Sequence, residues 1–187
     1  FPLGVGFVYM LRYEMIPFLR GYQATRILAW INPKEYSDAY WQQENSIMAI
    51  GSGQLWGKGL NNTEIASVKN GNFLSEEQTD FIFAIIGEEM GFVGAMIVIA
   101  LFLLLVYECL MMAYRAKDLS GRLICTGMAT LLAFQSFANI AVATAIFPNT
   151  GLPLPFVSYG VSSLLSLYIG IGVVLNVGLQ RRYSNEW

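Results

Sequence analysis

The sequence contains no histidine, few charged residues and only two cysteines. Without histidine the chain lacks the commonest general base and the commonest metal ligand, so proton chemistry would fall to Asp or Glu, with Lys or Tyr as weaker options. Charged residues make up 13% of the chain and the net charge is −2, which provides no basic surface for nucleic acid. Cys109 and Cys125 lie in or beside hydrophobic runs and form neither a metal-ligand pair nor a disulfide framework.

Hydrophobic residues, by contrast, account for 55% of the chain, and the mean hydropathy is +0.49. These values predict an integral membrane protein. Three apolar runs are long enough to cross a bilayer, which takes about 20 residues. We place transmembrane helices at residues 81–114, 119–147 and 161–180. The expected fold class is all-α, a polytopic helical bundle with one membrane domain over residues 1–187.

The segments around these spans have distinct characters. Residues 1–16 read as the end of an earlier transmembrane helix, which makes the chain a fragment. Residues 17–80 are expected to form a large loop that contains short amphipathic helices near Ala24–Ile31 and Tyr40–Ile50. Residues 148–160 contain three prolines and predict a re-entrant loop. Residues 181–187 form a tail.

Basic residues predict the topology. Arg115, Lys117 and Arg122 lie between the first two spans, and Arg181 and Arg182 follow the third. The positive-inside rule places both groups on the cytoplasmic side. Residues 17–80 and 148–160 would then share the outer face, with residues 181–187 as a cytoplasmic tail.

A glycine-rich stretch, GSGQLWGKG at Gly51–Gly59, invites comparison with a phosphate-binding loop. Its glycine spacing fits neither the dinucleotide-binding nor the P-loop pattern. We expect instead a tight turn that brings the backbone and Lys58 close to another part of the protein.

Carboxylates gather just before and inside the first span. Ser75 and Gln78 have the spacing of a capping box, and Glu76 and Glu77 would lie in the first turn of the helix, where its dipole favours acids. Asp80 would lie beyond that turn. Repulsion from the two glutamates and partial burial would raise the pKa of Asp80, which makes it a candidate general base. The alternative is an acid paired with an Arg or Lys.

Polar groups inside the spans have structural interpretations as well. Glu88 and Glu89 could form an ion pair, line a substrate path or be protonated. Gly87, Gly91 and Gly94 favour close helix packing. Polar side chains of the second span, Gln135, Ser136 and Asn139, are expected to bond across helices. The serines around Ser158 have no His or Lys neighbour in sequence and do not indicate a hydrolase.

Four segments resemble the SEDS family of shape, elongation, division and sporulation proteins, which includes RodA, FtsW and SpoVE. They are RILAWINP at Arg26–Pro33, QQENSIMAIGSGQLWGKGL at Gln42–Leu60, LSEEQTDFIFAIIGEEMGFVG at Leu74–Gly94 and PNTGLPLPFVSYGVSSLL at Pro148–Leu165. The resemblance covers essentially the whole chain and implies the last part of a ten-helix membrane protein. The chain departs from the family pattern at Ser75, Gln78 and Val161.

The resemblance implies a peptidoglycan glycosyltransferase that polymerises lipid II into glycan strands for elongation, division or sporulation. It would work in the bacterial cytoplasmic membrane, with its catalytic loop on the outer face, although this fragment alone would be inactive. Asp80 of the TDF motif is the implied general base. We expect substrate contacts from Lys58, Gln78, Thr79 and Ser158, and support from Glu76, Glu77, Glu89 and Asn139.

The implied partners are lipid II, undecaprenyl-pyrophosphate-linked glycan, a class B penicillin-binding protein and membrane lipid, and not nucleic acid. No cofactor is certain; a divalent cation, Mg or Mn, is left open for the leaving pyrophosphate. Two other interpretations stay open: a transporter that flips a lipid-linked precursor, and a non-catalytic membrane scaffold of the cell-wall machinery. A flippase would need acids reachable from both faces, whereas an enzyme needs one irreplaceable carboxylate on the outer face.

Overall fold

The computed structural model describes residues 21–60 and 80–180, and every regular element in these ranges is a helix. Three of the helices are long and apolar enough to cross a membrane. The predicted all-α membrane fold class is therefore confirmed. The elements are α2 (Gly21–Ile31), α3 (Ser37–Ser52), α4 (Ile82–Arg115), α5 (Leu119–Ala143) and α6 (Val161–Gln180).

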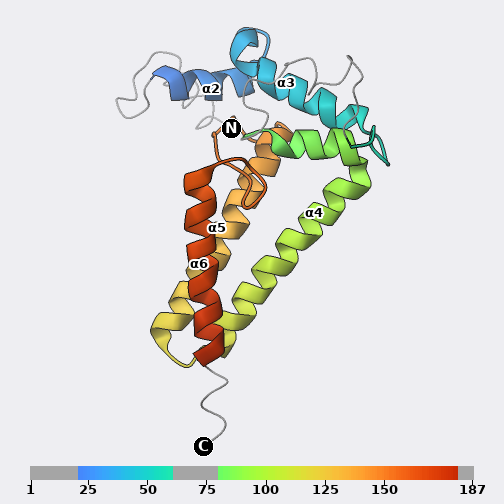
Figure 1. Ribbon diagram of the computed structural model, residues 1–187. Coiled ribbons are helices and arrows are strands. Elements are labelled where there is room, and N and C mark those ends of the chain that lie inside the picture. The colour runs from blue at the N-terminus through green and yellow to red at the C-terminus, as the bar shows by residue number, and fades with distance from the viewer. Residues whose placement is uncertain (1–20, 61–79, 181–187) are drawn as a thin grey trace, which may run out of the picture.

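The three long helices form a bundle, and α2 and α3 lie across one end of it (Figure 1). The loop between α5 and α6 lies at the same end, whereas the turn between α4 and α5 and the end of α6 lie at the opposite one (Figure 1). The described parts of the two regions expected on the outer face are thus together, and the basic turn after Arg115 is at the far end from them.

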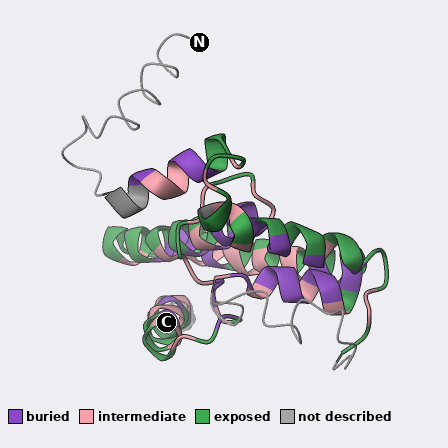
Figure 2. Cartoon of the chain, turned by 90° about the horizontal axis from the view of Figure 1, so that it is seen from above, coloured by how far each residue is buried: buried purple, intermediate pink, exposed green. Residues whose placement is uncertain are grey.

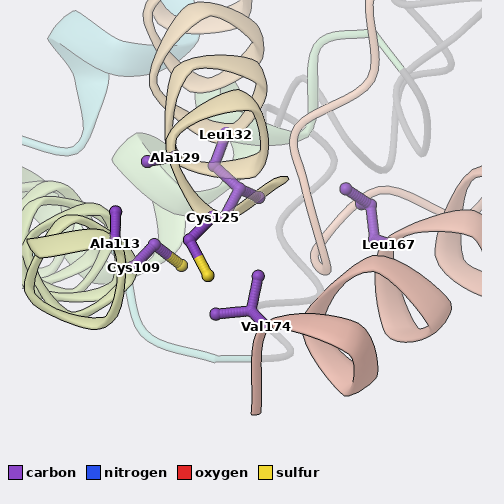
Figure 3. Packing of buried hydrophobic residues seen from close by; sticks show 7 residues of the cluster. All are labelled: Cys109, Ala113, Cys125, Ala129, Leu132, Leu167 and Val174. Atoms are coloured by element: carbon purple, nitrogen blue, oxygen red, sulfur yellow. The ribbon is translucent and has the colours of Figure 1, made fainter. Parts of the chain in front are cut away.

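The main core of the bundle is built from small side chains and thiols on facing helices (Figure 3). Small residues let helix backbones approach closely, which is how helices pack inside membranes. Larger apolar side chains from α5 and α6 fill the remaining space. The buried cluster consists of Cys109, Ala113, Cys125, Ala129, Leu132, Leu167 and Val174.

Outside this core the long helices leave much of their apolar surface exposed (Figure 2). In the most apolar stretch of α6 only 11% of residues are buried, and in that of α4 only 17%. Side chains such as Leu101, Leu103 and Leu165 are each at least 60% exposed. Such surfaces require an apolar environment, which lipid or further helices provide.

The second long helix is shorter than expected. The sequence predicted a span to residue 147, but α5 ends at Ala143. Ala145 adopts a positive φ of 55°, and the N–H groups of Ile146 and Phe147 both bond to the carbonyl of Ala141. The chain therefore turns back over the end of the helix instead of continuing it.

The short helix α3 buries a polar face against that end of α5. Gln43 Nε2 donates to the carbonyls of Val142 (3.1 Å) and Phe147 (2.7 Å), and Ser46 Oγ donates to the carbonyl of Ala143 (2.8 Å). The bonds to Val142 and Ala143 reach carbonyl groups that the end of α5 leaves without intrahelical partners, and the bond to Phe147 holds the turn that follows. The apolar side chains of α3 that were expected at the membrane interface, Trp41, Ile47 and Met48, are exposed.

Candidate functional site

Asp80 lies at the end of the bundle that α2, α3 and the α5–α6 loop cover. It is half-buried and forms part of a turn, and α4 begins two residues later at Ile82. The expectation that Asp80 is part of a helix is therefore wrong, whereas the predicted start of the span at residue 81 is within one residue of α4. Phe81, the N-cap residue, is fully buried and packs with Ala49, Ala84 and Val142, so burial of this aromatic ring fixes where the helix starts.

The backbone at Asp80 is held by a buried amide from α5. Asn139 Nδ2 donates to the carbonyl of Asp80 and to the carbonyl of Leu152, each at 2.8 Å. Asn139 is 1% exposed. A buried amide that binds two carbonyls fixes both of them, because each would lose its hydrogen bond if it moved. Asn139 thus holds the backbone of Asp80 and of the α5–α6 loop, and its supporting role in a reaction stays a prediction.

Gly151 in that loop lies close to both Asp80 and the guanidinium of Arg26. A Cβ atom at Gly151 would lie 3.5 Å from Asp80 Oδ2 and 3.8 Å from an Arg26 guanidinium nitrogen. Gly151 has a φ of 70°, which glycine adopts without strain. Arg26 also donates from Nη1 to the carbonyl of Asn149 (3.2 Å). The turn at Gly151 thus brings the carboxylate and the guanidinium to one place.

Arg26 is the site residue that the sequence interpretation missed. It lies in the RILAWINP segment, where it is the one charged residue in an otherwise apolar helix end. That isolation was a usable signal, because a charge on an apolar helix needs a partner. What the sequence did not provide was the fold of residues 144–160, which brings Asn149 and Gly151 to Arg26.

Ser158, expected to contact substrate, contributes to the fold of the α5–α6 loop. Its hydroxyl oxygen accepts a hydrogen bond from the N–H of Leu154 at 2.8 Å, and its own N–H donates to the carbonyl of Leu154 at 3.0 Å. The side chain is 3% exposed. Leu154 and Pro155 are buried as well, so this part of the loop is folded into the protein. A substrate contact of Ser158 stays a prediction.

Lys58, expected to be a substrate-binding cation, forms a buried ion pair with α4. Its Nζ lies 2.7 Å from Glu88 Oε1. Glu88 is 1% exposed and the Lys58 side chain is 22% exposed. Of the three alternatives for Glu88, the structure thus favours the ion pair. A substrate contact of Lys58 is not tested by this geometry and stays a prediction.

The glycine-rich segment Gly53–Gly59, which we call the glycine loop, packs against a break in α4. Gly91 adopts φ 66° and ψ −167° inside this helix, and the bend is visible in Figure 1. A Cβ atom at Gly91 would lie 2.3 Å from the nitrogen of Gly57. The sequence predicted close packing at Gly91 but not the break.

Four expected site residues, Glu76, Glu77, Gln78 and Thr79, lie outside the described residues. Another expected site residue, Glu89, is half-buried, and its carbonyl accepts a hydrogen bond from the N–H of Gly59 at 3.0 Å. Within residues 21–60 and 80–180 no three His, Cys, Asp or Glu side chains are grouped so that they could hold a metal ion. The groups available at Asp80 are therefore a carboxylate, a guanidinium and backbone carbonyls. A carboxylate can accept a proton, and a nearby guanidinium can stabilise a developing negative charge.

Comparison with known proteins places the whole chain in one group. A family model described as "Cell cycle protein" (FtsW, RodA and SpoVE) matches residues 3–183. The chain is 38% identical over 181 residues to "Probable peptidoglycan glycosyltransferase FtsW" of Geobacter sp. (strain M18), covering 96% of this chain and 48% of that protein.

Two further relatives have different names. "Stage V sporulation protein E" of Bacillus subtilis is 39% identical over 163 residues, covering 87% of this chain and 43% of that protein in the comparison. "Peptidoglycan glycosyltransferase MrdB" of Escherichia coli is 37% identical over 189 residues, covering 97% and 50%. The chain spans about half the length of the curated relatives it matches.

Two solved structures share the fold. One is a chain from "Structural coordination of polymerization and crosslinking by a peptidoglycan synthase complex", with a TM-score of 0.65 and 30% identity, covering 96% of this chain and 48% of that chain. The other is an Asp-to-Ala mutant of the rod shape determining protein RodA from Thermus thermophilus, with a TM-score of 0.53 and 40% identity, covering 57% and 36%.

Proposed function

The chain belongs to the FtsW, RodA and SpoVE family of SEDS membrane proteins, and from that premise we propose that it carries the outer-face catalytic end of a peptidoglycan glycosyltransferase that polymerises lipid II. The observation that carries the proposal is the geometry at Gly151, where the Asp80 carboxylate and the Arg26 guanidinium both lie within 4 Å of the Cβ position. Relatives named as peptidoglycan glycosyltransferases, FtsW and MrdB, support the reaction class.

In the proposed reaction Asp80 is the general base. It takes the proton from the 4-hydroxyl of the acceptor sugar while that oxygen attacks the anomeric carbon of the donor. The bond from the anomeric carbon to the lipid pyrophosphate breaks, and the configuration at that carbon is inverted. The hydrogen bond from Asn139 to the carbonyl of Asp80 supports this role, because a base must be held within reach of the proton it removes.

The leaving pyrophosphate needs positive charge beside it. Arg26 lies beside Gly151, and its guanidinium can bind two phosphate oxygens at once. Lys58, Gln78, Thr79 and Ser158 remain proposed substrate contacts, with Glu76, Glu77, Glu89 and Asn139 in support. A divalent cation, Mg or Mn, would supply further charge for the same group.

For orientation we propose that the end carrying Asp80 faces the outside of the bacterial cytoplasmic membrane. The basic residues at the turn after α4 support this assignment, because basic loops stay on the cytoplasmic side. A class B penicillin-binding protein is the proposed partner, which the match to a chain of a peptidoglycan synthase complex supports. The lipid II substrate and undecaprenyl-pyrophosphate-linked product would reach the site from the membrane.

A lipid-precursor transporter is the second candidate, and the break in α4 is the observation that favours it. Transporters place broken helices at their substrate sites so that freed backbone groups can bind the cargo. At Gly91, however, the freed groups bond to the glycine loop. Because these backbone groups already have partners, the break supports the enzyme rather than the transporter.

The test uses the full-length product of the gene that encodes this chain, purified and reconstituted in liposomes with fluorescent lipid II. We expect glycan strands longer than the disaccharide unit on a gel, and no strands in liposomes that lack the protein. Movement of lipid II between leaflets without any strand formation would support the transporter and contradict the enzyme. If neither strand formation nor lipid II movement is seen with the partner protein present, the scaffold interpretation is the one that remains.

A further inference from the structure

The glycine loop satisfies the backbone on both sides of the break in α4. On the first side, the carbonyls of Glu88 and Glu89 accept hydrogen bonds from the N–H groups of Lys58 (2.9 Å) and Gly59 (3.0 Å). On the second side, the N–H groups of Phe92 and Val93 donate to the carbonyls of Gln54 (2.8 Å) and Leu55 (3.2 Å). Helix ends leave such groups without intrahelical partners, so one loop caps both helix segments.

Glycines make this contact possible. Gly57 has a φ of 79°, and a Cβ atom there would lie 2.2 Å from the carbonyl oxygen of Glu89. At Gly53 a Cβ atom would lie 1.9 Å from the carbonyl oxygen of Gly87. These distances are far below contact between non-bonded carbon and oxygen atoms. Loop and helix therefore meet backbone to backbone, with no side chain between them.

The ion pair adds a charged contact at the same place. Glu88 is almost completely buried, and Lys58 Nζ reaches its Oε1 at 2.7 Å from the loop. Removing one partner of a buried pair leaves a charge in a poorly solvated place, whereas replacing both by apolar side chains is often tolerated. The pair therefore fixes the end of the first α4 segment to the glycine loop.

That first segment links the ion pair to Asp80. It runs from Ile82 to the break at Gly91, and rigid helix geometry transmits a shift at one end to the other. Its other end follows Phe81, which packs with Ala49 and Val142, and Asp80, whose carbonyl binds Asn139. Glu88 and Asp80 are thus opposite ends of one short, packed unit.

We propose that Lys58 is a positioning residue of the site: through its ion pair with Glu88 it holds the segment 82–90, and hence Asp80, in the geometry that the reaction requires. This inference rests on the proposed function and deepens it. For Lys58 it replaces the substrate contact proposed above by a role that needs no contact with substrate. It also explains why a lysine occurs in a loop whose spacing fits no phosphate-binding pattern.

The test separates positioning from substrate binding by comparing two single variants, Lys58→Met and Glu88→Met, in the full-length gene product with lipid II as substrate. Glu88→Met keeps the lysine, so a Lys58 that binds substrate would still do so. We expect both variants to lower kcat by about tenfold or more, since a catalytic group misplaced by an ångström can cost about 100-fold. KM should stay within about twofold in both variants, because neither variant removes a contact that binds the substrate.

Three further variants serve as controls. Lys58→Arg keeps the ion pair and should retain most of the wild-type kcat. Lys34→Met removes an exposed lysine from the turn between α2 and α3 and should leave kcat and KM unchanged. The double variant Lys58→Met with Glu88→Met should recover the thermal stability that the single variants lose while its kcat stays low. If a single variant does not fold, the double variant provides the kinetic comparison in its place.

Amide hydrogen exchange provides a readout that does not depend on activity. We expect faster exchange over residues 82–90 in Lys58→Met and Glu88→Met than in wild type and Lys34→Met. Unchanged exchange there overturns the inference even if the protein proves not to be a polymerase. A raised KM in Lys58→Met alone, with Glu88→Met at wild-type kcat, also overturns it and makes Lys58 a substrate contact. A wild-type kcat in the double variant also overturns the inference, because the ion pair is then not required for the reaction.

Discussion

Asn139 binds the backbone carbonyl of Asp80 through its side-chain amide, at 2.8 Å, from a helix 59 residues further along the chain. The same nitrogen binds Leu152, so one side chain joins the start of α4 to the α5–α6 loop. Gly151 in that loop lies beside both the Asp80 carboxylate and the Arg26 guanidinium. The candidate site therefore depends on a buried amide that takes no part in the proposed chemistry.

Replacing Asn139 with Ala should reduce both stability and activity. The change leaves two partly buried carbonyls without their donor, and an unsatisfied buried group costs about 1–3 kcal/mol. We expect the free energy of unfolding to fall by about 2 kcal/mol or more, measured by SDS titration of the purified protein. The matched control is Thr130→Ala on the same helix, whose exposed hydroxyl bonds only to the carbonyl of Thr126. A loss no larger than that of the control would contradict the role of Asn139.

Gly91→Ala should be the most damaging glycine substitution of those on the long helices. Gly91 occupies a backbone region that essentially only glycine adopts, and the added methyl group would meet the nitrogen of Gly57. We expect a loss of about 3 kcal/mol or more, or no folded protein. Gly127→Ala in α5 is the control: nothing lies within 4 Å of its Cβ position, so it should be neutral or stabilising by up to about 1 kcal/mol. Equal unfolding curves for the two variants would show that the break is not required.

Gln43→Leu should detach α3 from the end of α5. The side chain of Gln43 is 2% exposed and caps the carbonyls of Val142 and Phe147. Its loss should cost about 1–3 kcal/mol and increase protease cleavage in the α5–α6 loop, detected by mass spectrometry of limited digests. Gln42→Leu, one residue earlier and only half-buried, is the matched control. Identical digests of the two variants would argue against this cap.

Cysteine labelling in intact cells tests the orientation. The native Cys109 and Cys125 are buried, so a membrane-impermeant maleimide should not react with them. A cysteine introduced at the exposed Lys34 should be labelled from outside, and one at the exposed Lys117 only after the cells are opened. Labelling of both positions from the same side would contradict the proposed topology.

Much of this fold could be predicted from sequence because membrane spans depend on composition. The long apolar runs and the basic turn after Arg115 predicted the fold class and the arrangement of the long helices. The motif around Asp80 marked the candidate base by family resemblance. The glycines of Gly51–Gly59 correctly suggested a turn that brings Lys58 to another part of the protein, and that part is Glu88.

What the sequence did not show depends on contacts between distant segments. The span was placed within one residue of α4, but the turn at Asp80 was missed because Ser75 and Gln78 have a good local capping pattern, whereas the N-cap residue of α4 is the buried Phe81. The break at Gly91 looks like an ordinary small-residue packing site until its partner loop is known. Arg26 lacked a role for the same reason: Gly151, which brings it to Asp80, is 125 residues away in sequence and close only in the fold.

The central claim is that Asp80 is the base of a lipid II polymerase, and single-turnover polymerisation by an Asp80→Asn variant tests it most directly. The amide has nearly the same shape but cannot accept the acceptor's proton, so the rate should fall by about 100-fold or more while the unfolding midpoint stays at the wild-type value. Asp38→Asn, an exposed acid in the first turn of α3, should polymerise at the wild-type rate. Polymerisation by Asp80→Asn at the rate of Asp38→Asn would contradict the account.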